Sequence, residues 1–227
     1  MQRLLDVVLS GLALLLLLPV LIPVAIVLRL TGEGEVFYRQ QRVGRGGHLF
    51  GVWKFATMLK NSPGMGTGTV TLKDDPRVLP VGRFLRRTKI NELPQLVNVL
   101  GGSMSIIGPR PQTPRCFNAF PPAARQVIAG LRPGLSGIGS IVFRDEEQLM
   151  HADAEPDRLY DAVIMPYKGR LEEWYARHRT TGIYCRLILL TLWVVVFPRL
   201  DVVWRMFPDL PRPDAHLAGL LGVQPDG

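Results

Sequence analysis

One long apolar segment dominates the pattern of hydrophobic and polar positions. No charged residue lies between Val7 and Leu28. As a helix this run is about 33 Å long at 1.5 Å per residue, which matches a bilayer core of about 30 Å. A secretory signal peptide fits poorly, because the run is long, Asp6 precedes it and no small-x-small cleavage site follows. The pattern therefore predicts a helix that enters a membrane.

Two prolines interrupt this segment. Pro19 and Pro23 lack an N–H, so two backbone carbonyls lose their helical donors, and both defects fall on one face. This predicts a kinked helix, which either crosses the membrane or turns back to the side it entered. Basic residues such as Arg3 and Arg29 lie on both flanks, which places the bulk of the chain in the cytoplasm by the positive-inside rule. We therefore expect a re-entrant helix broken at Pro19 and Pro23.

The rest of the chain alternates short strand and helix patterns. Strands are expected at Glu35–Tyr38 and Leu49–Phe55, as a hairpin or as two short strands joined by a flexible turn, and at Ile138–Phe143. A glycine-containing loop is expected at Asn61–Thr69, and its spacing is not that of a dinucleotide-binding fingerprint. Helices are expected at Gly82–Lys89, from Asn91 to Leu100, at Pro122–Leu131, at Glu155–Arg177 with an interruption at Pro166, and at Ile183–Phe197. The last of these has tryptophans beside it and is typical of an interfacial or core helix. After Pro208 we expect a poorly ordered tail.

Candidate phosphate chemistry concentrates between residues 82 and 95. Arg83, Arg86 and Arg87 share one helix face. Asn91 is a good N-cap for the next helix, so Asn91 and Glu92 are expected at a helix N-terminus, where free N–H groups favour a phosphate or a carboxylate. A solvated face and plain capping would explain these residues one by one, but their adjacency favours a phosphate clamp. The apolar positions of the second helix predict a core-facing stripe, made of Leu93, Leu96, Val97 and Leu100.

A second candidate is Arg110, which lies between Pro109 and Pro111. The two prolines stiffen the backbone on either side of the arginine. A guanidinium suits bidentate recognition of a phosphate. On its own such a tripeptide is more often an ordinary loop, so the assignment depends on the neighbouring motifs.

Composition narrows the class of protein. The net charge is +8 and the hydrophobic fraction is 47%, which excludes a disordered chain and indicates anionic headgroups or phosphates as partners. Two cysteines are too few for a disulfide framework, and the four histidines show no zinc-ligand spacing. Nucleic acid is not expected as a partner, because exposed aromatic residues do not alternate with the basic ones.

Several motifs, in order, resemble those of the bacterial sugar transferases, the monotopic phosphoglycosyl transferases. Leu18 stands where that family usually has the serine of a Ser-Pro pair, and Ala56 stands where arginine is common. The matching stretches are Gln41–Gly44 (QRVG), Trp53–Met58 (WKFATM), Asn91–Leu96 (NELPQL), Ser103–Pro111 (SMSIIGPRP) and Arg132–Gly137 (RPGLSG).

The resemblance implies transfer of a sugar-1-phosphate from a UDP-sugar to a polyprenyl (undecaprenyl) phosphate with release of UMP, at the start of exopolysaccharide, O-antigen or glycoprotein glycan synthesis. It implies Mg²⁺ as cofactor. It also implies an α+β fold: a re-entrant membrane helix (residues 1–30), a small catalytic domain on the cytoplasmic face of the inner membrane (31–200) with interfacial amphipathic helices, and a C-terminal tail (201–227). Membrane lipids and a second copy of the chain are further expected partners.

The site implied by the resemblance departs from the family at one position. Asn91 stands where the family has the aspartate that attacks the β-phosphorus. Three explanations compete: Glu92 is the nucleophile, the chain is a natural variant of altered or lost activity, or the aspartate has been replaced by engineering. We favour Glu92 as the central catalytic and metal-binding residue, with Asp75 as the next candidate nucleophile. A membrane-bound scaffold or pseudoenzyme is the alternative function. The residues expected to bind substrate are Lys54, Arg86, Arg110, Pro111 and Arg144, since cations lower the repulsion between phosphates.

Overall fold

The computed structural model describes residues 1–65, 75–146, 149–150, 155–197 and 200–224. The chain divides into two compact units. We call Arg3–Gln41 together with Phe50–Gly102 the first unit, and Met1–Gln2, Arg42–Leu49 and Ser103–Gly227 the second unit. The expected division at residues 30 and 200 separates membrane, catalytic and tail roles rather than compact units, so it stays a prediction. The mixture of helices and short sheets agrees with the α+β class.

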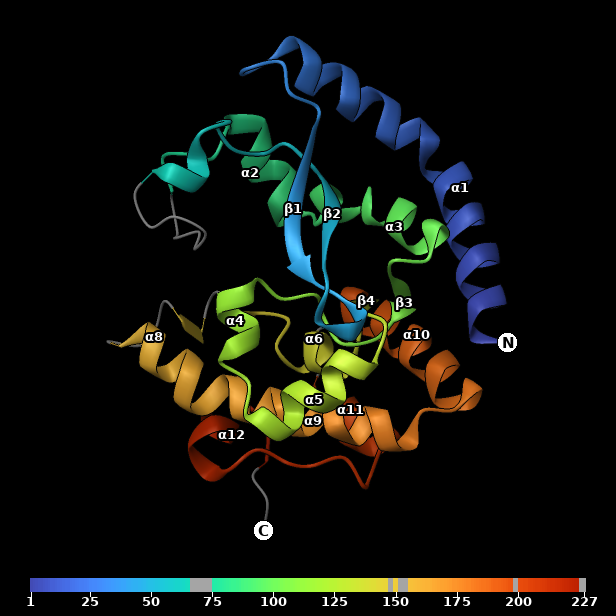
Figure 1. Ribbon diagram of the computed structural model, residues 1–227, viewed down its shortest axis with the longest axis vertical. Coiled ribbons are helices and arrows are strands. Elements are labelled where there is room, and N and C mark those ends of the chain that lie inside the picture. Colours follow the sequence, from blue (N-terminus) through green and yellow to red (C-terminus); the bar gives the residue numbers. More distant parts are fainter. Residues whose placement is uncertain (66–74, 147–148, 151–154, 198–199, 225–227) are drawn as a thin grey trace. The chain divides into compact units, whose positions relative to one another are not determined.

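Helix α1 (Gln2–Leu30) contains both prolines and continues through them. The break expected at Pro19 and Pro23 is therefore wrong: the helix is continuous, and its axis bends along its length (Figure 1). Within the described part of the chain, α1 is the helix that is long and apolar enough to cross a membrane by length and composition. Most of its side chains are exposed, and its buried residues are Asp6, Ser10 and Leu28.

The first unit continues with a hairpin and two short helices. Strands β1 (Phe37–Val43) and β2 (Leu49–Phe55) pair with each other. Their connection contains the short 3₁₀ turn Arg45–Gly47 and is far too short for a parallel crossover, so the two strands form a hairpin. The second strand has the predicted bounds, whereas the first begins at Phe37 and extends to Val43 instead of running over Glu35–Tyr38. A core of Leu28, Phe55 and Leu85 joins α1, β2 and α2 (Pro80–Arg87).

The apolar stripe expected on the next helix is confirmed only at Leu96. Helix α3 (Gln95–Gly101) buries Leu96 and Val99, whereas Val97 and Leu100 are 49% and 40% exposed. The reason is that two amide side chains, Gln95 and Asn98, point inward, which rotates the helix away from its most apolar face.

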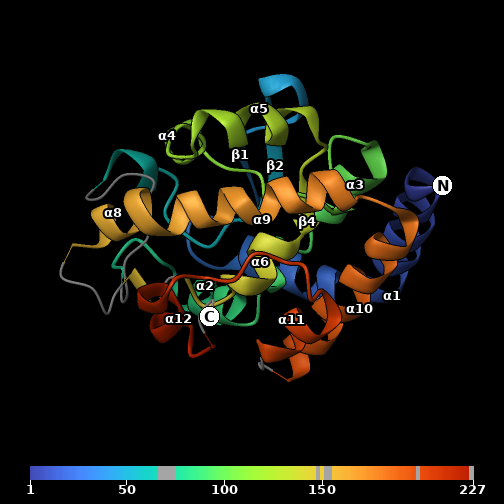
Figure 2. The same ribbon diagram turned by 90° about the horizontal axis from the view of Figure 1, so that it is seen from below.

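The second unit is built around helix α9 (Met165–His178). It lies between α5 (Pro122–Gly130) and α6 (Ile138–Val142), both of which contact it (Figure 2). Strands β3 (Ser105–Ile107) and β4 (Gly134–Ser136) form a parallel pair. The remaining helices are α4 (Pro114–Asn118), α8 (Pro156–Leu159), the π-helical turn Tyr160–Ile164, α10 (Thr181–Val196), α11 (Asp201–Met206) and α12 (Ala215–Leu221). The expected interruption near Pro166 is the π-helical turn that precedes it.

Two expectations for the second unit are wrong. The segment expected to form a strand at Ile138–Phe143 is helix α6, because strand propensity gives way to its packing against α9. The segment after Pro208 is ordered where it is described: Leu210 and Leu217 are buried, and α12 follows the N-cap Asp214. Of the loop expected at Asn61–Thr69, Asn61 to Met65 includes the 3₁₀ turn Ser62–Gly64, and the rest lies outside the described residues.

Candidate active site

Asn91 and Glu92 lie in a short 3₁₀ turn (Ile90–Glu92) that precedes α3. The turn starts after Lys89, whose φ of 59° lies in the left-handed region that non-glycine residues seldom adopt. Pro94, and not Asn91, is the N-cap of α3, so the expected capping role of Asn91 is wrong. The chain instead reverses at Lys89, and this reversal turns the Asn91 side chain into the protein.

Glu92 forms an ion pair with Lys54 of β2. Nζ of Lys54 lies 3.4 Å from Oε1 of Glu92, and the two side chains are 18% and 16% exposed. Charge-assisted N–H···O bonds are usually about 2.7–2.9 Å long, so this contact is loose.

Asn91 is buried, with 7% of its surface exposed, and its Oδ1 atom has no hydrogen-bond partner. Gln95, four residues further, is also buried, and its Nε2 atom has no partner. A buried amide atom without a partner costs on the order of 1–3 kcal/mol. Two such atoms, an acceptor and a donor, belong to residues within three positions of Glu92 in the sequence, and a bound ligand would satisfy them.

Asn98 fastens α3 to the strand that carries Lys54. The backbone N–H of Trp53 donates to Oδ1 of Asn98 at 2.9 Å, and Nδ2 of Asn98 donates to the Gly51 carbonyl at 2.9 Å. The side chain thus satisfies one donor and one acceptor of β2. Asn98 is not among the residues predicted from the sequence. Its amide among the apolar residues of this helix is the feature that would have indicated a buried polar contact.

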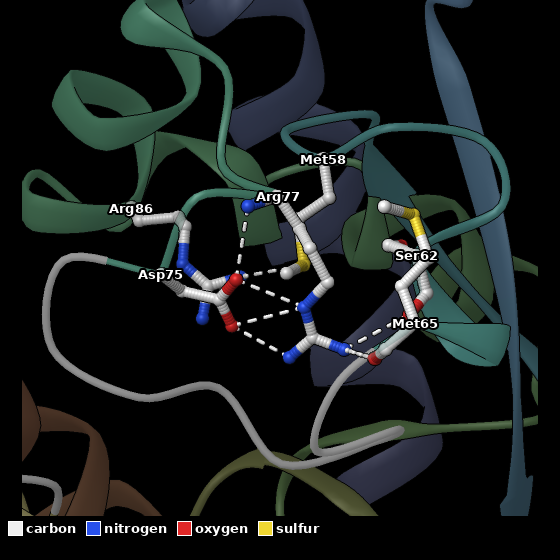
Figure 3. A network of polar contacts seen from close by, with 6 residues as sticks. All are labelled: Met58, Ser62, Met65, Asp75, Arg77 and Arg86. Atoms are coloured by element: carbon white, nitrogen blue, oxygen red, sulfur yellow. Dashed lines mark hydrogen bonds and ion pairs between the residues drawn. The ribbon is translucent and has the colours of Figure 1, made fainter.

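Figure 3 shows a buried ion pair between Asp75 and Arg77. Nη2 of Arg77 lies 2.5 Å from Oδ2 of Asp75, and Nε lies 2.9 Å from Oδ1. Nη1 of Arg77 donates to the carbonyls of Ser62 and Met65. The bidentate pairing commits the Asp75 carboxylate to Arg77, which favours a structural role over nucleophilic attack. Arg86 joins the group through Met58, with Nη1 3.7 Å from Sδ.

Arg110 and Pro111 belong to the second unit and follow strand β3. The N–H of Gly108 donates to the Ser136 carbonyl at 2.9 Å, and the N–H of Gly134 donates to the Pro109 carbonyl at 2.8 Å. These bonds brace the stretch that carries Arg110 against the one that begins at Arg132. A Cβ on Gly134 would lie 2.1 Å from the Gly108 nitrogen, so glycine is required for this approach. Arg110 and Pro111 both line a small pocket here.

Arg144 lies at the end of α10. Its guanidinium donates to the carbonyls of Val194 and Val195, the latter at 3.5 Å. These are among the last carbonyls of the helix, which lack helical donors. This contact gives Arg144 a capping role, and its predicted role in substrate binding stays a prediction.

The structure thus brings Lys54 and Glu92 into contact within the first unit, close in sequence to the buried Asn91. Arg86 lies in the same unit, in the Asp75–Arg77 network. Arg110, Pro111 and Arg144 lie in the second unit.

The donor set beside Glu92 fits Mg²⁺ in part. Mg²⁺ is usually bound by one or two carboxylates together with substrate phosphates and water. Glu92 offers a carboxylate, and Asn91 offers an amide oxygen without a partner. No group of three or more acidic, histidine or cysteine side chains suited to a metal occurs among the described residues, so phosphates and water would have to complete the shell.

The chain belongs to the family described as bacterial sugar transferase, which it matches over residues 1–198. It is 42% identical over 147 residues to the UDP-glucose:undecaprenyl-phosphate glucose-1-phosphate transferase of Escherichia coli (strain K12), covering 62% of this chain and 31% of that protein. It is 35% identical over 159 residues to the exopolysaccharide production protein ExoY of Sinorhizobium fredii, covering 64% of this chain and 70% of that protein.

A third relative is the UDP-N-acetylgalactosamine-undecaprenyl-phosphate N-acetylgalactosaminephosphotransferase of Aeromonas hydrophila, 35% identical over 146 residues, which are 62% of this chain and 34% of that protein. The chain therefore spans about a third of the length of several of these relatives. The relatives' names are those of transferases and of exopolysaccharide production, so the scaffold or pseudoenzyme alternative finds no support in them.

Proposed function

We propose that this chain transfers a sugar-1-phosphate from a UDP-sugar to a polyprenyl phosphate and releases UMP. The observation that carries the proposal is the Lys54–Glu92 pair, with Glu92 following the buried Asn91 whose amide oxygen has no hydrogen-bond partner, in a chain of this family. The names of the relatives supply the class of donor and acceptor, UDP-sugars and undecaprenyl phosphate.

In the proposed reaction a carboxylate oxygen of Glu92 attacks the β-phosphorus of the UDP-sugar. A bond forms between this oxygen and phosphorus, and the bond from phosphorus to the bridging oxygen of UMP breaks. An oxygen of the polyprenyl phosphate then attacks the same phosphorus and frees Glu92. Lys54 offsets the negative charge that gathers at the phosphates. Mg²⁺, when bound, would act as a Lewis acid on the diphosphate.

Membrane association follows from the apolar helix, and we propose that α1 is re-entrant. Both ends of α1 contact the first unit: Arg3 donates to carbonyls of α3, and Leu28 is in the core with Phe55 and Leu85. The middle of the helix is exposed, for example at Leu15 and Leu16. A helix that spans a bilayer would separate its two ends by the membrane, so attachment of both ends to one compact unit supports a helix that dips in and returns.

We further propose that α10 lies in the interface on the cytoplasmic face of the inner membrane. One side of α10 is buried through Leu187, Leu190 and Val194. Leu189, Trp193 and Val196 are spaced for another face of the helix and are at least half exposed. Apolar residues with a tryptophan on an unpacked face are typical of interfacial helices.

The test is UMP release by the purified protein in lipid nanodiscs with undecaprenyl phosphate, Mg²⁺ and a panel of UDP-sugars. UDP-glucose and UDP-N-acetylgalactosamine, the donors in the relatives' names, come first. Glu92→Gln should abolish release, because an amide is a poor nucleophile. The matched control is Glu35→Gln, an exposed glutamate of the same unit that pairs with Lys60. Unchanged release in Glu92→Gln would reject Glu92 as the nucleophile, and no release by the native protein with any donor would reject the function.

A further inference from the structure

The first turn of α1 is bonded to the end of α3. Nη1 of Arg3 donates to the Val99 carbonyl at 2.5 Å, and Nη2 donates to the Leu100 carbonyl at 2.7 Å. The last carbonyls of a helix lack the usual helical donors and carry the negative end of the helix dipole. The Val99 carbonyl also accepts from the N–H of the C-cap Gly102, at 3.0 Å, so Arg3 adds a second donor there. A guanidinium can serve two of them at once, which a lysine cannot do in the same geometry.

The neighbouring backbone leaves room for this arginine. Gly102, the C-cap of α3, has a φ of 86°, and a Cβ at this position would lie 3.1 Å from Nη2 of Arg3. On α1 itself, Asp6 and Ser10 share a face with Arg3 and are buried. The first turn of this otherwise apolar helix is therefore docked on α3 through Arg3 and not only inserted in lipid.

Helix α3 has the reacting residues at its other end. It has seven residues, a length of about 10 Å, and helices this short do not hold their shape without tertiary contacts. Besides the packing of its buried Leu96 and Val99, it is held by hydrogen bonds from Arg3 at the C-terminal end and between Asn98 and β2 in the middle. The turn with Asn91 and Glu92 precedes its N-terminal end. A loss of the Arg3 contact would therefore loosen the helix that sets the position of Glu92.

We propose that Arg3 is a positioning residue that makes docking of the membrane helix a condition for an ordered catalytic turn. Arg3 acts through α3 and does not touch the substrate. The effect on catalysis rests on the function proposed above, whereas the effect on the order of α3 does not.

The experiment compares Arg3→Ala with Arg29→Ala in lipid nanodiscs. Both substitutions remove one positive charge from a flank of the apolar run, but Arg29 donates to the Gly34 carbonyl next to its own end of α1. Hydrogen exchange measured by mass spectrometry should be roughly tenfold faster in peptides from residues 93–102 of Arg3→Ala. Exchange in α2 should not change, and Arg29→Ala should match the native protein in residues 93–102, with any change confined to the neighbourhood of the lost Gly34 contact.

A second variant, Arg3→Lys, controls for the possibility that Arg3→Ala fails to insert in the membrane. Arg3→Lys keeps the charge and one hydrogen bond, so exchange in residues 93–102 should lie between the native protein and Arg3→Ala. For UMP release, the turnover number should fall in the order native, Arg3→Lys, Arg3→Ala, with little change in the KM for the UDP-sugar.

Two results would overturn the proposal: native exchange in residues 93–102 of both Arg3 variants, or the same acceleration in Arg29→Ala. The first would mean that α3 is ordered without Arg3, and the second that flank charge alone matters. If the native protein releases no UMP with any donor, the proposed function fails, but the exchange measurements still decide the role of Arg3.

Discussion

Asn91 stands where the family resemblance leads us to expect an aspartate, and Asn91→Asp tests what the amide does. If Glu92 is the nucleophile, UMP release by Asn91→Asp should stay within about tenfold of the native rate, equal to about 1.4 kcal/mol. A carboxylate at this buried position also adds a desolvation cost, so the variant should unfold at a lower temperature. A larger rise in release would instead identify position 91 as a nucleophile site that the native amide disables.

Glu172 on α9 gives a residue-scale prediction about pH. Complete burial raises the pKa of its carboxyl group from 4.5 to about 7, although the charge of Lys168 and the N–H of Gly139 act in the opposite direction. Lys168 itself pairs with Glu146 at 2.7 Å. The folded protein therefore keeps a proton on Glu172 that the unfolded chain loses above pH 4.5.

Stability should accordingly fall as the pH rises from about 4.5 to about 7, by on the order of 3 kcal/mol from this group. Glu172→Gln cannot titrate, so its free energy of unfolding relative to the native protein should rise over the same interval and level off above pH 7. The measurement is denaturant unfolding of both proteins across this range, with the exposed Glu155→Gln as control. Parallel curves for the native protein and Glu172→Gln would contradict the assignment.

At the scale of elements, α3 holds the hairpin through a single amide. Asn98→Ala should leave the Trp53 N–H and the Gly51 carbonyl without partners and destabilise the protein by about 2–4 kcal/mol, the combined cost of two buried polar groups. Asn61→Ala, at an exposed position of the same unit, is the control and should change stability little. Thermal unfolding measures both variants. Equal midpoints for Asn98→Ala and the native protein would show that the hydrogen bonds of Asn98 do not stabilise the fold.

The sequence predicted the elements more reliably than their faces. The hairpin, α2 and α5 follow from strand and helix patterns that their tertiary contacts reinforce. The buried face of α3 could not be predicted from the spacing of apolar residues. Asn98 faces inward because it bonds the backbone of β2, a strand far away in the sequence. The sequence motifs likewise predicted Lys54 and Glu92 as site residues. That the two form an ion pair depends on the fold, because they lie far apart in the sequence. Strand propensity at Ile138–Val142 was overridden by packing against α9.

At the scale of the whole molecule, the decisive question is on which side of the membrane each end of α1 lies. Single cysteines at Gln2 and Glu35 should react with a membrane-impermeant maleimide from the same side, because Arg3 and Leu28 attach both ends of α1 to the first unit. The native Cys116 and Cys185 are free and must first be replaced by serine. A cysteine at the exposed Arg179 reports the side of the second unit.

Pro19→Ala combined with Pro23→Ala should shift this equilibrium toward spanning. The substitutions restore two helical N–H donors and remove the crowding of the preceding turns, so a straighter helix becomes less costly in lipid. The contacts of Arg3 and Leu28 oppose the shift, since a spanning helix would have to break one end free. We therefore expect a mixed population in the double proline variant and full conversion only when Arg3→Ala is added. Labelling of positions 2 and 35 from opposite sides in the protein with both prolines intact would reject the re-entrant topology.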